Sequence, residues 1–298
     1  MPEMNRRVTF RLLPMVLGLL AVAFISIRGC QEGPFGRKQV VLLNPQQEAQ
    51  LGAQAYREVL SKAEVVGNGP LVDMVQEVTR RLAKATEHPE FLRLTKLKPR
   101  KFDWEVRVVQ AREVNAFCLP GGKMVVYTGI LPVCETDAGL AVVMGHEISH
   151  ALASHGAERM AQQQMAQIGV TAAGHSLGDL SYNERASLMR VLNAGATYGI
   201  LKYSREHESE ADRMGLLLMA TAGYDPREAA LFWERMAKLS TGGGPPEFMS
   251  THPSHERRIR DLQGWVPEAL PLFQAYGSPQ RPRPLPRDRS FSGGSRGH

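Results

Sequence analysis

Apolar residues recur at helical spacing over two stretches early in the chain, residues 45–60 and 70–86. In the first stretch Leu51, Ala55 and Val59 fall on one face, and the second stretch carries a similar stripe. Apolar side chains three and four positions apart share one side of a helix, which can then bury that side against a core. The sequence therefore predicts two amphipathic helices in this region.

The period of the pattern changes to two beyond residue 100. Trp104, Val106 and Val108 alternate with other residues, and a second alternating stretch, residues 114–127, is interrupted by a glycine-rich turn. Alternation of this kind is typical of half-buried strands, and the glycines are typical of a turn between two of them. We therefore expect a small antiparallel sheet.

Helical spacing returns near Thr136, where Thr136 or Asp137 can cap a helix by accepting hydrogen bonds from its first turn. Gly223 suits the end of a later helix, and Asp225-Pro226 suits the start of the next. Together with the small sheet, these helices predict an α+β fold that is mostly α. The expected helices cover residues 138–154, 157–200 with a break around 174–179, 203–222 and 226–239.

An apolar run of 16 residues, Leu12 to Ile27, follows three arginines near the N-terminus and is ended by Arg28. A charged start before an apolar stretch is the pattern of an export signal. A membrane-spanning helix needs about 20 apolar residues, with a lower limit of about 17, so this run lies close to that limit. The segment either stays as a signal anchor or is cleaved before Cys30, which then carries a lipid; simple secretion is a third outcome. The first two outcomes tether the chain to a membrane on its extracytoplasmic, periplasmic side.

Composition divides the chain into four parts. Residues 1–30 form the export segment, and residues 31–40, which contain two glycines and a proline, are expected to be a linker. Residues 41–275 are long enough to form one folded domain with its own hydrophobic core. Residues 276–298 are rich in Pro, Arg, Ser and Gly, which predicts a disordered basic tail. The sequence makes no prediction of the oligomeric state.

Charge and cysteine content exclude two classes of protein. The net charge of +6 comes largely from the tail, where five arginines outnumber one aspartate, and the rest of the chain is close to neutral. Since the sequence also contains no nucleic-acid-binding motif, we exclude RNA and DNA as partners. The three cysteines lack the spacing of a disulfide framework, and Cys118 and Cys134 either pair in an oxidising compartment or remain buried thiols.

The helix expected over residues 138–154 carries a metal-binding pattern, His146-Glu147-Ile148-Ser149-His150. Histidines four positions apart lie one above the other on a helix face, so both imidazoles can bind one zinc ion. Glu147 lies one step round the helix, where its carboxylate can act as general base on a water molecule whose pKa the zinc lowers. A surface helix can carry two histidines without any function, so the pattern needs a third ligand.

A second helix, expected over residues 203–222, offers that ligand. Glu208 and Asp212 lie four positions apart and share a face. One carboxylate can bind the zinc while the other accepts a hydrogen bond from a ligand histidine. Taken alone, this stretch is as well explained by an exposed acidic face with ion pairs such as that between Glu208 and Arg205. The histidine pair on the preceding helix favours the metal site.

These motifs, in this order, resemble the HtpX, Oma and CAAX-prenyl-protease family of gluzincin zinc metallopeptidases. The resemblance covers roughly residues 41–265. It is carried by several segments that follow one another along the chain in the same order as in the family. These are His146-Glu147-x-x-His150, Ser204-Arg205-x-x-Glu208-x-x-Ala211-Asp212, Val114-Asn115-Ala116-Phe117 with Pro120-Gly121-Gly122, Ala222-Gly223-Tyr224-Asp225-Pro226, and Thr251-His252-Pro253 with Arg258-Ile259.

The resemblance implies a zincin-like fold with one zinc ion per chain and a polypeptide as substrate. It implies His146, His150 and Glu208 as zinc ligands and Glu147 as general base. Asp212 would orient a ligand from behind, and His252 and Arg258 would act on the charge that develops on the substrate. The edge strand, which would bind the substrate's main chain, comprises Asn115, Ala116 and Phe117.

The family resemblance and the single apolar segment together predict an endopeptidase for misfolded or misassembled envelope and membrane proteins. Members that process prenylated tails inside a membrane chamber have several hydrophobic spans, so that activity is not expected here. Two alternatives stay open: a zinc-containing, chaperone-like binding protein whose proteolysis is latent or lost, and a metal-dependent aminopeptidase. His252, a potential ligand on a glycine-rich loop, leads to one more hypothesis, that it occupies the fourth zinc position at rest.

Overall fold

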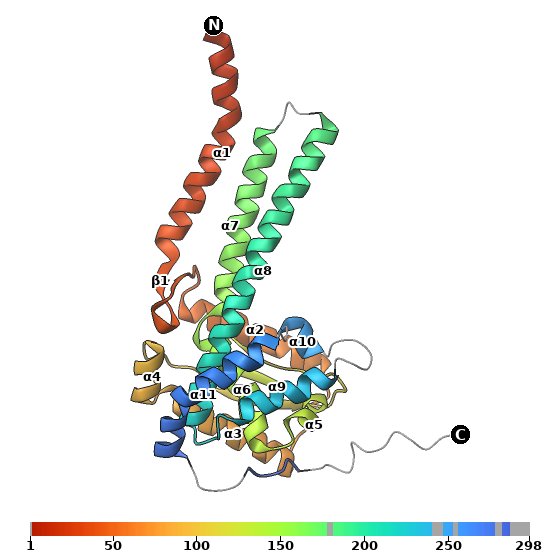
Figure 1. Ribbon diagram of the computed structural model, residues 1–298. Helices are drawn as coiled ribbons and strands as arrows, with labels where there is room; N and C mark the ends of the chain where they lie inside the picture. The colour runs from red at the N-terminus through yellow and green to blue at the C-terminus, as the bar shows by residue number, and fades with distance from the viewer. Residues whose placement is uncertain (1, 178–180, 240–246, 253–255, 278–281, 287–298) are drawn as a thin grey trace, which may run out of the picture. The chain divides into compact units, whose positions relative to one another are not determined.

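A computed structural model describes residues 2–177, 181–239, 247–252, 256–277 and 282–286. The chain forms two compact units, and each unit is made of two separate stretches of sequence (Figure 1). Unit 1 comprises Met1–Asn44 and Ser154–His207, and unit 2 comprises Pro45–Ala153 and Glu208–His298. The predicted loop over residues 242–246 lies outside the described residues.

Unit 1 consists of three long helices and a short hairpin. Helices α7 and α8 run side by side in Figure 1 and are joined in sequence by a short connection. The chain that was expected to be a linker forms the antiparallel hairpin, in which Cys30 pairs with Val40. The elements of unit 1 are α1 (Pro2–Gly29), β1 (Cys30–Glu32), η1 (Pro34–Gly36), β2 (Lys38–Val40), α7 (His155–Ser176) and the first part of α8 (Tyr182–Thr221).

Helix α1 contains an apolar stretch, Leu12–Gly29, with a mean hydropathy of 2.1, and only 11% of this stretch is buried. Within the described part of the chain it is the one helix long and apolar enough to cross a membrane. One face of it packs on α7: Gly18 lies against Ala172, and the Ser26 Oγ is 3.5 Å from the Met165 Sδ. The rest of its apolar surface is exposed, as expected for a membrane anchor or an export signal.

An arginine, a glutamate and two histidines lie together in unit 1, and we call them the unit 1 ion cluster: Arg37, His155, Glu158 and His207. The two terminal nitrogens of the Arg37 guanidinium donate to the Glu158 carboxylate, each at 2.8 Å. The His207 Nε2 lies 2.9 Å from the same carboxylate, and the His155 ring stacks on the His207 ring at 4.2 Å. Burial raises the pKa of Glu158, but hydrogen bonds from His207 and Arg37 outweigh it and lower the pKa to about 2.

Unit 2 places a mostly helical layer around one small sheet. Helices α2 and α3 confirm the two amphipathic helices expected from the apolar pattern, with bounds that agree within two residues. The elements are α2 (Pro45–Lys62), α3 (Pro70–Thr86), α4 (Pro89–Thr95), β3 (Glu105–Val109), β4 (Ala116–Leu119), β5 (Lys123–Tyr127), η2 (Thr128–Ile130), α5 (Leu131–Cys134), α6 (Asp137–Leu152), the last part of α8, α9 (Glu228–Leu239), α10 (Glu247–Thr251) and α11 (Glu256–Tyr276).

The sheet of unit 2 has the strand order β3-β5-β4 and is mixed. The β4–β5 pair is antiparallel as expected, but the β3–β5 pair is parallel, so the expectation of a wholly antiparallel sheet is wrong. The reason is that Gly121 and Gly122, at φ values of 87° and 96°, turn the chain back tightly after β4. The returning β5 lies between β4 and β3 and points the same way as β3. As a result β4 is an edge strand.

Helix α6 lies at the centre of unit 2, and almost every one of its residues is buried. The Thr136 Oγ1 accepts from the Gly139 N–H at 3.1 Å, which confirms the expected cap. Gly145 on α6 faces Gly215 on α8, and a Cβ added to Gly215 would lie 3.0 Å from the His146 nitrogen. The two glycines therefore let the backbones of α6 and α8 approach closely, directly beside the histidine pattern.

One sequence expectation about the helices is corrected by the structure. Helix α8 runs without interruption from Tyr182 to Thr221, whereas the sequence suggested separate helices on either side of residue 201. Within the tail that was expected to be disordered, Arg283 donates to the Asp137 carboxylate at 2.9 Å and lies 3.0 Å from that of Glu77. Residues 278–281 and 287–298 of this tail lie outside the described residues. The segment is also held by backbone hydrogen bonds, from the Asp137 N–H to the Arg283 C=O and from the Leu285 N–H to the Glu135 C=O, both at 3.0 Å.

Candidate metal centre and active site

Four side chains of unit 2 converge on one point, and we call them the metal group: His146, His150, Glu208 and His252. One ligand atom from each lies within 4.8 Å of the others. Helix α6 carries the first two at i and i+4, α8 carries Glu208, and His252 directly follows α10. The structure thus brings together, from three separate parts of the sequence, the three expected zinc ligands and the expected gating histidine.

The distances within the metal group fit a bound metal ion. The His146 Nε2 lies 3.1 Å from the His150 Nε2 and 3.3 Å from the Glu208 Oε2, and the His150 Nε2 lies 3.4 Å from the Glu208 Oε1. Donor atoms that surround zinc in a tetrahedron at about 2.0–2.1 Å are about 3.4 Å apart. Among the described residues, the buried Glu208 Oε1 has no hydrogen-bond partner. The His/His/Glu group therefore has the donor set and the spacing of a metal site.

The charges around the metal group favour a bound cation. Burial raises the pKa of Glu208, but the charge of His150 and hydrogen bonds from His146 and His252 hold it well below its usual range. Burial and the charge of Arg258 lower the pKa of His146, but hydrogen bonds to Asp212 and Glu208 outweigh them and raise it to about 9. A positive charge is thus stabilised at the point where the ligand atoms meet.

Asp212 and Arg258 both contact the side chain of His146. The Asp212 Oδ1 lies 3.0 Å from the His146 Nδ1, an arrangement that leaves the Nε2 lone pair directed into the metal group. The Arg258 Nε lies 2.6 Å from the Asp212 Oδ2, and its guanidinium carbon lies 3.4 Å from the centre of the Trp233 ring. Arg258 is buried and holds Asp212, so its expected action on substrate charge remains a prediction.

Glu147 lies beside the metal group with the properties of a general base. Its carboxyl group is buried, and burial is the main cause that raises its pKa above the usual value. The backbone N–H of Cys118 in β4 donates a hydrogen bond to this carboxylate. The Glu147 Oε1, which has no hydrogen-bond partner within the described residues, lies 3.4 Å from the His252 Nε2. A desolvated carboxylate in this position is suited to taking a proton from water near neutral pH.

His252 occupies the remaining corner of the metal group. Its Nδ1 lies 2.9 Å from the Glu208 Oε2 and 3.1 Å from the His146 Nε2. The Phe248 ring lies 4.7 Å from the His252 ring and stacks on Trp233 at 5.7 Å. This is the arrangement expected if His252 fills the fourth metal position at rest.

The expected substrate strand is β4 together with Asn115, which precedes it. Ala116 is buried, and the Asn115 Oδ1 accepts from its backbone N–H at 2.9 Å. The Phe117 side chain packs against Tyr127, with ring centres 6.0 Å apart, and belongs to the core rather than to the metal group. Phe117 also pairs with Val125 of β5, so its side chain and its main chain both belong to the interior of the sheet.

Sequence reasoning did not find three residues that the structure places at the site: Cys118, Trp233 and Phe248. Cys118 contacts Glu147 through its backbone, which no residue type reveals. Trp233 and Phe248 support Arg258 and His252, but in the sequence they read as ordinary apolar positions of α9 and α10. Their distance from the histidine pattern along the chain leaves no local signal.

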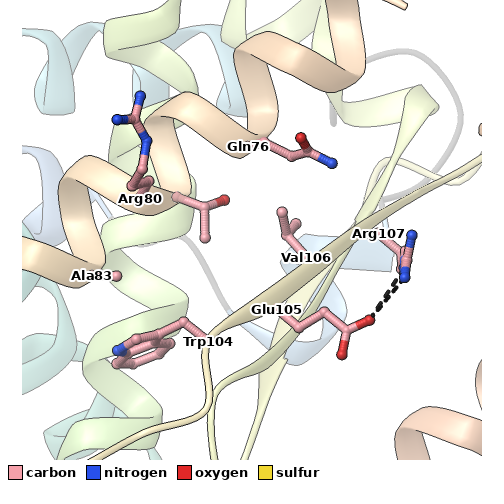
Figure 2. Close-up of a pocket in the computed structure, with 8 residues that line it drawn as sticks. Gln76, Arg80, Ala83, Trp104, Glu105, Val106 and Arg107 are labelled. Carbon is pink, nitrogen blue, oxygen red and sulfur yellow. Dashed lines mark hydrogen bonds and ion pairs between the residues drawn. The ribbon is translucent and has the colours of Figure 1, made fainter. Parts of the chain in front are cut away.

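A separate hollow of about 360 Å³ lies between α3 and β3, and Figure 2 shows Gln76 and Arg80 on the helix side and Val106 on the strand side. Trp104 closes one side, and Glu105 is ion-paired with Arg107 at 3.1 Å. None of its lining residues belongs to the metal group.

Comparison with known proteins agrees with this site. Residues 74–266, which include every member of the metal group, match the sequence profile of the family described as Peptidase family M48. The chain is 37% identical over 229 residues to mitochondrial metalloendopeptidase OMA1 of Schizosaccharomyces pombe, covering 74% of this chain and 62% of that protein. It is 30% identical over 287 residues to metalloendopeptidase OMA1 of Danio rerio, covering 91% of this chain and 57% of the relative.

A bacterial relative is also found. The beta-barrel assembly-enhancing protease of Escherichia coli is 27% identical over 231 residues, covering 76% of this chain and 45% of the relative. The chain thus spans less than two thirds of the length of each of these three proteins.

Proposed function

This chain belongs to peptidase family M48, and on that premise we propose that it is a zinc-dependent metalloendopeptidase. The observation that carries the proposal is the convergence of His146, His150 and Glu208 beside a buried carboxylate, Glu147, whose pKa is raised. A purely structural metal site needs no base next to it. The names of the relatives, a metalloendopeptidase in Schizosaccharomyces pombe and a protease in Escherichia coli, support the same activity.

Each residue of the site has a function in this proposal. His146, His150 and Glu208 would hold one zinc ion, which, when bound, polarises the scissile carbonyl and lowers the pKa of water. Glu147 takes the proton from the attacking water and then gives it to the amine that leaves. Asp212 keeps His146 in the tautomer that presents Nε2.

Arg258 and His252 complete the assignment. Arg258 holds Asp212 in place through their ion pair of 2.6 Å. His252 can also donate a hydrogen bond to negative charge on the substrate oxygen once it leaves the metal group. Stabilising that charge is the residue's second function in our proposal, beside that of a fourth ligand at rest.

The substrates we propose are extended segments of misfolded or misassembled envelope and membrane proteins. An edge strand such as β4 binds main-chain groups, so it accepts many sequences but only extended ones. The name of the Escherichia coli relative, a beta-barrel assembly-enhancing protease, points to the same class of client. An apolar N-terminal helix would hold the enzyme close to such clients.

We propose that α1 tethers the protein to the extracytoplasmic face of a membrane. The exposed apolar surface of Leu12–Gly29 supports an anchor, and the exposed Cys30 at its end is available for a lipid after cleavage. Both forms lead to the same side of the membrane. Carbonate extraction and the mass of the N-terminal peptide distinguish them.

Hydrolysis of an unfolded protein tests the proposed activity. Casein should be cleaved internally by the zinc-loaded protein, and Glu147→Gln should lower kcat by about a thousandfold while zinc content stays at one per chain. Cleavage that persists in Glu147→Gln would refute the mechanism, and release of single N-terminal residues would indicate an aminopeptidase. Stoichiometric zinc without any turnover would favour the chaperone-like binding protein, for which the position of His252 in the metal group is the supporting observation.

A further inference from the structure

The outer edge of β4 is the part of the sheet that a substrate chain would join. The Asn115 C=O accepts from the Tyr127 N–H at 3.1 Å, and the Leu119 C=O accepts from the Gly122 N–H at 3.1 Å. Residues 115, 117 and 119 therefore direct their main-chain groups toward β5. Because these groups alternate along a strand, those of Val114, Ala116 and Cys118 point to the free edge.

Other groups of this protein already occupy that edge. The Val114 C=O accepts from the Phe248 N–H at 3.0 Å. The Ala116 N–H donates to the Asn115 side chain at 2.9 Å, and the Cys118 N–H donates to the Glu147 carboxylate. An extended peptide binds a sheet edge through these same N–H and C=O groups. A substrate must therefore displace internal partners before it can pair with β4.

One of the three partners also holds the gating histidine. Phe248 binds β4 through its N–H, and its C=O accepts from the His252 N–H at 2.9 Å. Its side chain is fully buried and lies against the His252 ring at 4.7 Å. The short helix α10 thus has one end fixed to the substrate edge and the other in the metal group.

We propose that a substrate segment opens the site by taking the Val114 carbonyl from Phe248, which draws α10 and His252 away from the metal group. This inference rests on the proposed function and deepens it, because edge binding and release of the fourth ligand become one step. Phe248 is then a positioning residue: it senses the substrate through its N–H and holds His252 through its C=O and ring. The step requires a substrate that donates an N–H to Val114, so a proline at that position of the substrate prevents opening.

The number of histidines on the metal gives a test that needs no turnover. The protein is prepared with zinc and Glu147→Gln, and reduced, carboxymethylated lactalbumin serves as a permanently unfolded ligand. X-ray absorption at the zinc edge counts bound imidazoles, and we expect three in the free protein and two at saturating ligand. Three imidazoles in both states, with binding verified by fluorescence anisotropy, would overturn the proposal.

A matched pair of variants isolates the link through Phe248. Phe248→Ala and Phe248→Pro both remove the ring, but only proline removes the N–H that binds Val114. Proline is tolerated in the first turn of a helix, where Phe248 lies in α10. We expect Phe248→Pro to bind zinc with fewer imidazoles in the free protein, and to cleave lactalbumin with a kcat/KM about five- to tenfold above that of Phe248→Ala.

The outcomes separate this inference from the proposed function. Equal imidazole counts and equal kcat/KM in the two Phe248 variants would refute the link while leaving the peptidase intact. The same conclusion would follow if the wild type cleaves lactalbumin while the Glu147→Gln protein keeps three imidazoles on zinc at saturating ligand. A fall to two imidazoles without any cleavage would keep the link and refute the endopeptidase. The imidazole count uses the Phe248-containing protein, so it remains decisive if Phe248→Pro fails to fold.

Discussion

The unit 1 ion cluster and the metal group are both buried sets of histidines and a glutamate, yet their geometry differs. In the unit 1 ion cluster, Arg37 and His207 donate to both oxygens of Glu158, so the carboxylate is fully satisfied by protein groups. In the metal group the imidazole nitrogens crowd around one point, and the Glu208 Oε1 has no hydrogen-bond partner in the described structure.

The comparison teaches what distinguishes a metal site from a structural ion cluster. Composition does not, because both sets contain histidine beside glutamate. What matters is whether the donors are paired with each other or aimed at a common point. The His207 Nδ1 also lacks a partner among the described residues, but a single unpaired donor does not make a metal site.

The largest expected effect comes from removing one histidine from each set. His150→Ala should abolish stoichiometric zinc binding and hydrolysis, since it removes one of three ligands. His155→Ala should retain one zinc per chain and cost roughly 1–3 kcal/mol of unfolding free energy, because a buried stacked ring is lost. Zinc content by mass spectrometry and urea unfolding measure the two effects. The distinction between the sets fails if His155→Ala also loses zinc.

Glu158→Gln should destabilise the protein strongly without affecting zinc. The variant leaves the Arg37 and His207 donors without their charged partner, and breaking a buried pair costs about 3 kcal/mol or more. Glu90→Gln is the control, because it removes an exposed pair with Arg93 and should leave unfolding unchanged. An equal effect of both substitutions in urea unfolding would contradict the assignment.

The pKa of Glu158 makes this contribution depend on pH. The folded-state pKa of about 2 lies below the ordinary value of 4.5, so the contribution is present in full above about pH 5. It is lost as the pH falls from about 5 toward 2, and amounts to about 3 kcal/mol. Urea unfolding at several pH values should show a steeper loss below pH 5 in the wild type than in Glu158→Gln. If the unfolding free energies of the wild type and Glu158→Gln fall in parallel below pH 5, Glu158 does not cause the loss.

The smallest expected effect tests the support of the metal group. Asp212→Asn keeps the shape of the side chain but removes the charge that Arg258 and His146 share, so zinc affinity should fall about 10- to 100-fold. Competition with a chelator of known affinity measures the change. Asp225→Asn, which removes a surface pair with Arg227, is the control and should bind zinc as the wild type does.

The parts of this protein that sequence reasoning found are those in which one element carries the whole pattern. The helix period identified α2, α3 and α6, and the i, i+4 spacing by itself placed His146 and His150 on one helix face. The family resemblance identified Glu208 on α8, where spacing alone left two carboxylates to choose from. Local periodicity and short motifs suffice for such features.

The parts that sequence reasoning missed depend on contacts between distant segments. The parallel pairing of β3 with β5 depends on which side of β4 the returning chain takes, and alternation does not encode that choice. The pairing of Arg37 with Glu158 joins residues 121 positions apart. In the sequence Arg283 is one of several arginines of a basic tail, and only the folded structure shows that it pairs with Asp137.

The crossing of Gly145 and Gly215 sets the width of the active site. Because no side chain separates the two backbones, α6 and α8 are in direct main-chain contact at this point. The close approach of these two backbones fixes the distance between α6 and α8. A methyl group added at either glycine would push the helices apart and move His146 and His150 away from Glu208. Attempts to redesign the enzyme for other metals or substrates have freedom at α10 and along β4, but must leave these two positions unchanged.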